Sequence, residues 1–510
     1  MRDVVRLVVI AAILAGVVFG GSLGGVSGAA AGFVLGVVLL VVPWRGQPLR
    51  VWVWLFLRRN RPLTLREPAT VASDRSGAVR FQDGVAVAAI QLLGKRHQPT
   101  VFSGSTSART ANAVDAVALA SLIRRSIGLR WESFSIICAG VRRRNSGDYP
   151  QVYDTLIGTN PYAGRRETWM VLRTRALSNG DEMHWRPTLG TAVVAATQRI
   201  AVALRCSGIR ARVATAADLV ELERRLGADV LEPRNRHWHS LREQSGWHTT
   251  YAYRAADITS EALAQPWSLR ADGIIQNLTV FSDGSASATV SVRTAQPPTA
   301  SPGMMLRTLP GEQHHAAAAN LAGPRPEIRG LQRGPLPAAL ILPVGASGVL
   351  LGKLAGGDRL LLPLGDPAEP VRVSIAADDT VAKRIIIRAA AAGERVTVHT
   401  TDVGRWASVR MPSVAVIEHP RPVAGTTVSV MDGTVASAPR AATVISVRPA
   451  GSAPEPAADI VIVQSGPAHL EVFASGEWND VEMELFRAEN RYAPEELVDK
   501  ALFATTDSGD

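Results

Sequence analysis

The feature that most constrains this chain is a run of 36 consecutive uncharged residues, Leu7–Val42, made mainly of Val, Leu, Ala and Gly. As one α-helix the run would extend ~54 Å at ~1.5 Å per residue, whereas the hydrocarbon layer of a bilayer is ~30 Å thick. One tilted helix does not absorb that excess. Glycine is concentrated at residues 20–28 (GGSLGGVSG), which is typical of a turn. We therefore predict a transmembrane hairpin with helices near residues 5–20 and 28–42.

The positions of the arginines predict the orientation of this hairpin. Residues 1–66 contain eight arginines and one acid, Asp3, a balance of +7, so the other 444 residues carry only +3 of the net +10. Arg2 and Arg6 precede the first helix, the others follow the second, and the turn has none. Because cytoplasmic flanks are enriched in Lys and Arg, we expect a multi-pass protein of the cell inner (plasma) membrane with both termini cytoplasmic. The alternative, a cleavable signal peptide over residues 1–30, fits less well, because the apolar run continues and ends in a basic segment.

A mixed aromatic and basic segment follows the second helix. Indole rings suit the headgroup zone, and arginines attract anionic lipid. The predicted membrane-interface residues are Trp44, Arg45, Arg50, Trp52, Trp54, Arg58, Arg59 and Arg61. The segment is expected either to hold the soluble body close to the membrane and contact neighbouring subunits, or to be an ordinary stop-transfer flank. Nucleic acid is not an expected partner, because a binding surface for it would need basic residues spread over the folded body.

The remaining chain alternates strand and helix patterns, which predicts an α/β fold in two lobes with mixed sheets. Strands are predicted at residues 85–93, 134–138, 168–172 and 209–214, and helices at residues 111–127, 191–207 and 215–226, the last opening on a capping box of Thr215 and Asp218. A hairpin is predicted at residues 274–292 with its turn at 282–284, and a strand–helix–strand unit at residues 371–400. The predicted division is a hairpin at 1–44, a juxtamembrane segment at 45–70, a first α/β lobe at 71–228, a β-hairpin region and Pro/Gly-rich linker at 229–335, and a second α/β lobe with a polar tail at 336–510. The only two cysteines, Cys138 and Cys206, form no CxxC and are interpreted as small core residues in a reducing compartment.

No motif in the sequence indicates catalysis. GxGxxG is absent, the segment at 348–354 (GVLLGKL) lacks the glycine spacing and hydroxyl of a P-loop, and the one GxSxG lies in the predicted hairpin turn. His237, His239 and His248 are the only dense histidine group; a zinc site there is the alternative to polar surface or core histidines. The Asp-x-Asp triplet common in metal-dependent sugar transfer is absent. We therefore predict no catalytic, cofactor-binding or metal-binding residues, and no enzyme activity.

Several segments nevertheless resemble a known family. They are GVAVAAIQLLG (84–94), VYDTLIG (152–158), RETWMVLR (166–173), ILPVGASGVLLGKL (341–354) and AAAAGERVTVHTTD (389–402), behind an arginine-flanked double span. Together they resemble EccE, a membrane core component of type VII (ESX) secretion systems. The resemblance implies a non-catalytic subunit of an inner-membrane complex with EccB, EccC and EccD, whose bulk is cytoplasmic.

A second hypothesis from a different class remains open at this point. α/β sheets commonly bind ligands at the ends of their strands, so the chain could be a membrane-tethered nucleotide-sugar transferase or a degenerate relative that keeps a ligand-binding cleft. The missing phosphate loops and the missing Asp-x-Asp triplet favour the secretion subunit.

Overall fold

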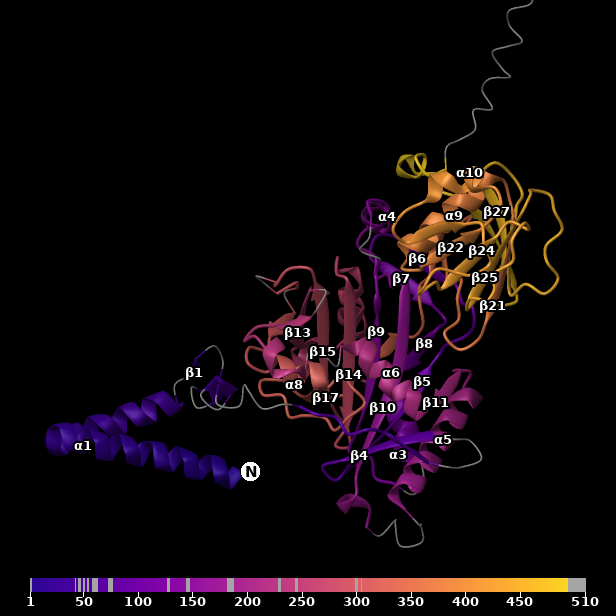
Figure 1. Cartoon of the computed structure of the whole chain (residues 1–510). Helices are drawn as coiled ribbons and strands as arrows, with labels where there is room; N and C mark the ends of the chain where they lie inside the picture. The colour runs from indigo at the N-terminus through magenta and orange to yellow at the C-terminus, as the bar shows by residue number, and fades with distance from the viewer. Residues whose placement is uncertain are drawn as a thin grey trace, which may run out of the picture.

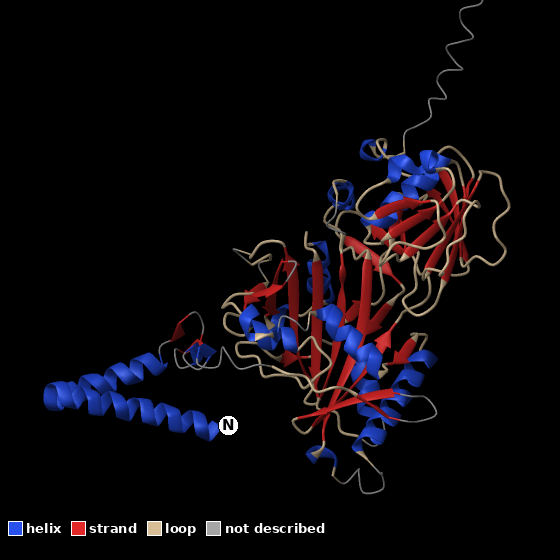
Figure 2. Cartoon of the chain, viewed as in Figure 1, coloured by secondary structure: helices blue, strands red, loops and turns tan. Residues whose placement is uncertain are grey.

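The computed structural model places two apolar helical arms beside a body built around two large sheets (Figures 1 and 2). The described residues are 2–41, 43–44, 47–48, 51–52, 55–56, 63–71, 77–125, 129–143, 147–180, 188–227, 231–243, 246–298, 301–303 and 305–493. The mixed α/β class predicted from the sequence is confirmed, with sheet making up most of the body.

The N-terminal element is α1 (Arg2–Val41), in which only Gly24 and Gly25 depart from helical backbone angles. Gly25 has φ +60°, a left-handed conformation that glycine adopts without strain. The two arms meet at this bend and lie side by side, projecting away from the body (Figure 1). Helical backbone therefore continues further into the glycine-rich segment than the sequence indicates, and the non-helical part is two residues rather than nine.

The first large sheet is antiparallel at every pairing that the structure describes. Its central order is β12-β13-β15-β14-β9-β10-β5-β4-β3, with β11 beside β5, β16 beside β13 and β17 beside β15. Its strands are β3 (Ala69–Val71), β4 (Gly77–Gln82), β5 (Val85–Leu92), β9 (Ser133–Val141), β10 (Arg165–Arg175), β11 (Ala211–Val213), β12 (Leu241–Glu243), β13 (Gly246–Tyr253), β14 (Gly273–Phe281), β15 (Ser285–Thr294), β16 (Leu306–Thr308) and β17 (Gly334–Pro335). The predicted mixed sheet is thus wrong for this half of the chain.

Residues 229–335 are an integral part of this antiparallel sheet. The predicted hairpin at 274–292 is confirmed as β14 and β15, turning at Asp283 and Gly284. The stretch at 297–337, however, contains β16, α8 (Gln313–Ala318) and β17, and is therefore not a linker. Pro and Gly obscure these short elements in the sequence because each is held by pairing or burial against the sheet rather than by its own periodicity. Whether residues 71–228 fold independently of residues 229–335 stays a prediction.

Helices cover both faces of the antiparallel sheet. On one face α5 (Leu189–Cys206) and α3 (Ala116–Arg125) share a core with α7 (Ser260–Ala264) and the β5, β9 and β10 side chains that point that way. On the other face α6 (Ala216–Leu226) and α8 form a second core. The predicted capping box of α6 is confirmed: Thr215 and Asp218 cap each other. Cys138 lies in the core as expected, but Cys206 is exposed at the end of α5, which corrects the prediction for that thiol.

The second large sheet is mixed. Its order is β23-β22-β24-β25-β21-β26-β27-β28-β19-β20-β6-β7; the pairings from β23 to β26 are parallel and the others antiparallel. Its strands are β6 (Thr100–Ser103), β7 (Ser107–Thr110), β19 (Val349–Lys353), β20 (Arg359–Leu362), β21 (Val371–Ala376), β22 (Val396–His399), β23 (Val414–Ile417), β24 (Val428–Met431), β25 (Thr443–Arg448), β26 (Ile460–Gln464), β27 (His469–Ala474) and β28 (Glu477–Glu482). The predicted strand–helix–strand unit is confirmed as β21, α9 (Asp379–Ala391) and β22, and the short α10 (Val403–Trp406) follows.

The chain crosses between the two sheets several times. The β6–β7 hairpin, from the N-terminal half of the sequence, pairs with β20 at an edge of the mixed sheet. β8 (Ala113–Asp115) pairs with β18 (Ile341–Pro343), and α4 (Tyr149–Ile157) packs on α9. Tyr162 is buried in the core of the mixed sheet and donates a hydrogen bond to Gly348 O at 2.6 Å. These crossings bind the sheets together (Figure 1).

A buried ionic network anchors the C-terminal end of the described chain to α9. Arg384 and Arg388 lie one helical turn apart and are both 0% exposed, as is Glu489 in the short 3-10 helix η8 (Arg487–Glu489). Arg388 Nε donates to Glu489 Oε1 at 2.6 Å, and Tyr149 from α4 donates to the same oxygen at 2.5 Å. Burial opposes the charge of Arg388, but the hydrogen bonds and charge of Glu489 outweigh it and raise the pKa of the guanidinium.

Removing one partner of this network should destabilise the mixed sheet strongly. Glu489→Ala leaves two buried arginines without their carboxylate, and a broken buried pair costs ~3–5 kcal/mol. Thermal unfolding of the full-length chain should therefore begin at a clearly lower temperature, whereas Glu221→Ala, which removes an exposed partner on α6, should leave it unchanged. Equal behaviour of the two variants would contradict a structural role for the network.

Candidate functional site

The two arms of α1 are packed against each other by glycine. A Cβ added at Gly28 would overlap the backbone oxygen of Gly20, and one added at Gly32 would overlap that of Gly16. Only glycine allows the helical backbones to approach this closely. Small residues serve this purpose between transmembrane helices, where packing rather than the hydrophobic effect holds helices together.

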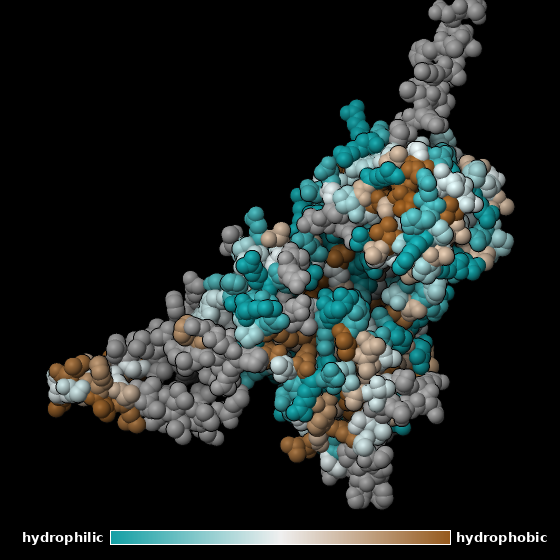
Figure 3. Space-filling view, viewed as in Figure 1, coloured by the Kyte–Doolittle hydropathy of each residue, from teal (hydrophilic) through white to brown (hydrophobic). Residues whose placement is uncertain are grey.

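The large apolar side chains of α1 point away from this contact. Those with described side chains and high exposure are Leu14, Val18, Phe19, Leu23, Val26, Phe33 and Val34; Val26 is 90% exposed and Leu23 76%. Figure 3 shows this apolar surface at the bend of the helix pair. A water-soluble helix pair would bury such side chains in its contact. The arrangement, with small residues inside and large apolar residues outside, is the one that a lipid environment stabilises.

Two helical stretches among the described residues are long and apolar enough to cross a membrane. Ile13–Val34 has a mean hydropathy of 1.6 and is not buried in the body, whereas Leu189–Cys206 has 1.2 and is 44% buried. The second stretch is α5, which packs on β5 in the core of the antiparallel sheet. Length and composition alone do not distinguish the two stretches. Their burial does, because α5 lies in the core of the body and Ile13–Val34 does not.

The eight predicted membrane-interface residues are only partly described. Trp44 belongs to β1 (Pro43–Trp44), which pairs with β2 (Gln47–Pro48) just after α1. Trp52 is placed against the body. The other six, Arg45, Arg50, Trp54, Arg58, Arg59 and Arg61, lie outside the described residues. Their role at the interface stays a prediction.

Trp52 and Leu55 are buried against the body, which the sequence did not indicate. The ring of Trp52 lies 5.0 Å from that of Trp238, and the two residues from the juxtamembrane segment are 7% and 5% exposed. Gly311, with φ +77°, donates its N–H to Trp238 O at 2.6 Å, and a Cβ there would press on both Leu55 and Trp238. This contact connects the segment that follows α1 to the antiparallel sheet. Its only signal in the sequence is an isolated tryptophan in a polar stretch.

The chain leaving the juxtamembrane segment is fixed to the same sheet. The backbone oxygen of Arg66 accepts a hydrogen bond from Arg80 Nε at 2.5 Å, and Gln82 Nε2 donates to Thr64 O at 2.9 Å. Leu65 packs so closely on Gly323 that a Cβ there would meet its side chain. Residues 64–66 are therefore joined to the body by defined contacts.

The histidine group considered for zinc does not converge on a metal position. His248 is buried in β13, with no hydrogen-bond partner at either ring nitrogen among the described residues, while His237 stacks on Trp247 at 4.9 Å. No group of three His, Cys, Asp or Glu residues that could hold a metal occurs in the part of the chain that the structure describes. Burial, with a smaller effect from Arg293, lowers the pKa of His248 to about 3, so this ring is a neutral core residue.

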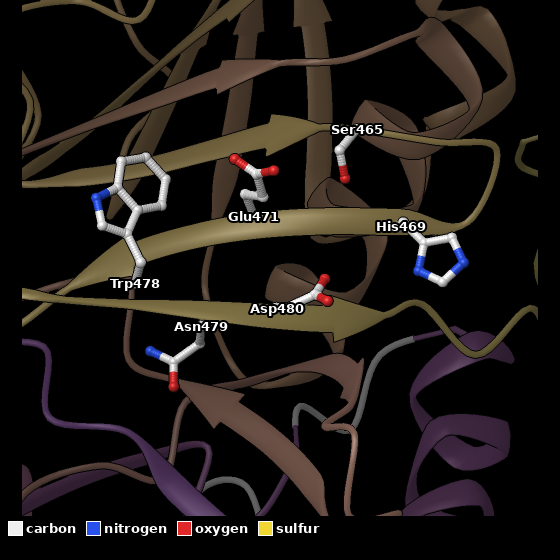
Figure 4. A pocket seen from close by; sticks show the side chains of 6 residues that line it. All are labelled: Ser465, His469, Glu471, Trp478, Asn479 and Asp480. Carbon is white, nitrogen blue, oxygen red and sulfur yellow. The ribbon is translucent and has the colours of Figure 1, made fainter.

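A shallow pocket lies on the outer face of β26, β27 and β28 (Figure 4). Glu471 and Asp480 stand directly opposite each other there, and no ion pair to either carboxylate occurs among the described residues. Trp478 is 58% exposed and contacts Phe473, at 5.3 Å between ring centroids. Like charges opposite each other destabilise a sheet. The pocket is thus an acidic, aromatic surface. Ser465 and His469 also line it, and no side-chain hydrogen bond joins these two among the described residues.

The contact between the α1 arms can be tested by cross-linking. A Cβ at Gly21 would lie 3.5 Å from the Cβ of Ala29, which is within the Cβ–Cβ range of a disulfide. In a Cys206→Ser background, Gly21→Cys/Ala29→Cys should become protected from alkylation on mild oxidation. Leu14→Cys/Ala29→Cys, whose first cysteine lies about two turns away along the arm, should stay reactive. Equal reactivity of the two pairs would contradict the close contact.

The burial of His248 predicts a loss of stability in mild acid. Its folded pKa is below the unfolded value of 6.5, so the unfolded state binds more protons as pH falls below about 6.5. Between pH 7.5 and pH 5.5 this single group should cost about 1.4 kcal/mol of unfolding free energy. His248→Leu should reduce the loss by that amount, and His469→Leu, at an exposed position, should not. A pH dependence unchanged in His248→Leu would show that the ring is not buried as a neutral group.

Comparison with known proteins identifies the family. The family model described as a type VII ESX secretion system translocon, EccE, matches residues 162–253, which run from the end of the α4–β10 connection to β13. The ESX-2 secretion system protein EccE2 of Mycobacterium tuberculosis (strain CDC 1551 / Oshkosh) is 47% identical over 485 residues, 90% of each chain. The ESX-1 secretion system protein EccE1 of the same strain is 28% identical over 358 residues, 68% of this chain and 71% of the relative.

A shorter match is to the ESX-5 secretion system protein EccE5 of Mycobacterium marinum (strain ATCC BAA-535 / M), which is 32% identical over 113 residues, 22% of this chain and 28% of that protein. The resemblance found in the sequence is thereby confirmed, since the first relative is 47% identical and covers 90% of this chain. This chain belongs to the EccE family of type VII (ESX) secretion-system proteins.

Proposed function

We propose that this chain is a non-catalytic structural subunit of an inner-membrane ESX complex, anchored by the α1 hairpin and presenting a cytoplasmic α/β body to partner subunits. Two observations together carry the proposal: the 47% identity to EccE2 and the exposed apolar side chains of α1. Glycine forms the contact between the arms, and large apolar residues face outward. The expected partners are the other ESX membrane components EccB, EccC and EccD, together with anionic lipid at the juxtamembrane segment.

The body supports a presenting role in two ways. Separate apolar cores underlie the antiparallel and the mixed sheet, which is consistent with two lobes. The contact of Trp52 with Trp238 fixes the first of these sheets to the end of the anchor. A body held in one orientation relative to the bilayer presents the same surfaces to every neighbouring subunit. The catalytic alternative, a metal-dependent nucleotide-sugar transferase, has no group of three His, Cys, Asp or Glu residues to hold a metal among the described residues.

Co-purification tests this proposal. The full-length chain, tagged at its C-terminus and extracted with mild detergent from cells that express a complete ESX locus, should migrate in a large complex containing EccB, EccC and EccD. Migration only as a monomer would contradict the assembly role.

A charge variant tests the juxtamembrane segment separately. Arg58→Glu/Arg59→Glu/Arg61→Glu should reduce the yield of membrane-inserted complex several-fold, because each arginine near anionic lipid contributes ~1 kcal/mol. The matched control, Arg58→Lys/Arg59→Lys/Arg61→Lys, keeps the charge and should assemble normally. An unchanged complex in the glutamate variant would refute a role for these arginines.

A further inference from the structure

A cavity of about 750 Å³ lies between the two large sheets, at the ends of β5, β9 and β10. On the side of the antiparallel sheet it is lined by the ends of these strands and the loop that follows β5, and on the other side by the loops after β20 and α9. Its back wall is held by the connection before β10: Ser347 donates its N–H to Ala163 O at 2.7 Å, and a Cβ at Gly164 would overlap Ala392 O. The volume is that of a small-molecule site.

One wall of this cavity contains a buried cation without a carboxylate. Arg166 is 8% exposed; its Nη1 donates to Pro343 O at 3.1 Å and its guanidinium lies 4.2 Å from the ring centroid of Trp267. Its Nε has no hydrogen-bond partner, and no acid lies within ion-pair distance, among the described residues. Burial lowers the pKa of Arg166 to about 10, so it remains charged at pH 7. A buried charge without a counterion is costly, so a bound anion at this position would stabilise it.

Other charged pairs around the cavity are already satisfied. Arg212 meets Asp218, Arg225 meets Glu167, and Arg210, just outside the lining, meets Asp366. These pairs do not supply a counterion to Arg166. An anionic ligand beside Arg166 would supply the charge that these pairs do not. One carboxylate of the lining, Asp272, likewise forms no ion pair among the described residues.

A second cation is held at the cavity by a rigid loop. Asn112 Oδ1 accepts the N–H of Lys95 at 2.6 Å, and Asn112 Nδ2 donates to Lys95 O at 3.0 Å. The side chain of Asn112 fills the space beside Gly94, which has φ +68°. The Lys95 side chain itself is exposed and forms no ion pair with the described residues. The backbone of Lys95 is therefore fixed at the cavity, and its exposed side chain has no ion-pair partner among the described residues.

The same loop presents an unused hydrogen-bond acceptor. His97 is 5% exposed with a left-handed backbone, φ +49°, and its Nδ1 lies 3.2 Å from Pro363 O. Since a carbonyl oxygen only accepts, Nδ1 carries the proton and Nε2 is the acceptor in the neutral ring. Nε2 is buried without a partner among the described residues. Backbone strain of this kind persists where the surrounding structure enforces it, often at ligand sites.

From these groups we infer that the cavity between the sheets is a binding site for a small organic anion, a phosphate or a carboxylate, that also carries a hydroxyl donor. Arg166 and Lys95 bind the anionic group, and His97 Nε2 accepts the hydroxyl. The inference concerns binding alone and is independent of the proposed membrane anchoring, so either can fail without the other.

The test is thermal unfolding of the full-length chain in detergent with four probes at 10 mM. Ribose 5-phosphate and gluconate carry both an anion and hydroxyls, whereas ribose lacks the anion and inorganic phosphate lacks the carbon-bound hydroxyls. Binding to the folded state raises Tm by mass action, and we expect a rise of about 2–5 °C with at least one of the first two probes. The probe that works distinguishes phosphate from carboxylate. No shift with either would overturn the inference.

Variants locate the site. Lys95→Met changes an exposed side chain and should reduce the ligand-induced rise in Tm by at least half, while the unliganded Tm stays the same. Arg166→Met should abolish the ligand-induced rise. Arg109→Met, at an exposed arginine on β7 away from the cavity, is the matched control and should keep the full shift. A shift unchanged in both Lys95→Met and Arg166→Met would place binding elsewhere. Equal shifts with inorganic phosphate and ribose 5-phosphate would overturn the role given to His97.

Discussion

The close backbone contact between the two arms of α1 is the constraint on which this account depends. Gly20 and Gly28 leave no room for a side chain between the helices, so the large apolar residues of both arms occupy the outside. In water this surface would be unstable, since an exposed apolar patch of that extent promotes association. In lipid the same surface is solvated, and the glycine contact is what holds the pair together. The proposed place of the body beside a membrane follows from this arrangement, in which glycine lies inside the helix pair and large apolar residues lie outside.

The arms of α1 are close together in the sequence, whereas the body is held together by contacts between segments that are far apart in the sequence. The β6–β7 hairpin completes the mixed sheet although it lies more than two hundred residues before most of its neighbours, and Glu489 joins α9 and α4 near the other end of the chain. The same crossings enclose the cavity that contains Arg166. A rigid body with fixed surfaces suits a subunit of an assembly.

Local signals were sufficient for part of this structure. The capping box at Thr215, the hairpin turn at Gly284 and the buried run of β5 are encoded by neighbouring residues, and the sequence predicted all three. The elements between residues 297 and 337 were missed because they are held by the sheet they pair with. The antiparallel character of the first sheet was missed for the same reason, since strand direction is set by connections rather than by strand composition. The contact of Trp52 with Trp238 and the unpaired state of Arg166 exist only after folding brings distant residues together.

Topology mapping tests the central claim most directly. Single cysteines at Ser22, beside the bend, and in the exposed turn at Gly356 can be probed in intact cells with a membrane-impermeant thiol reagent, in a background with Cys206→Ser. The account predicts that the cysteine at residue 22 is labelled from outside and that the one at residue 356 is labelled only after the membrane is opened. Labelling of residue 356 in intact cells would place the body on the wrong side of the bilayer and contradict the account.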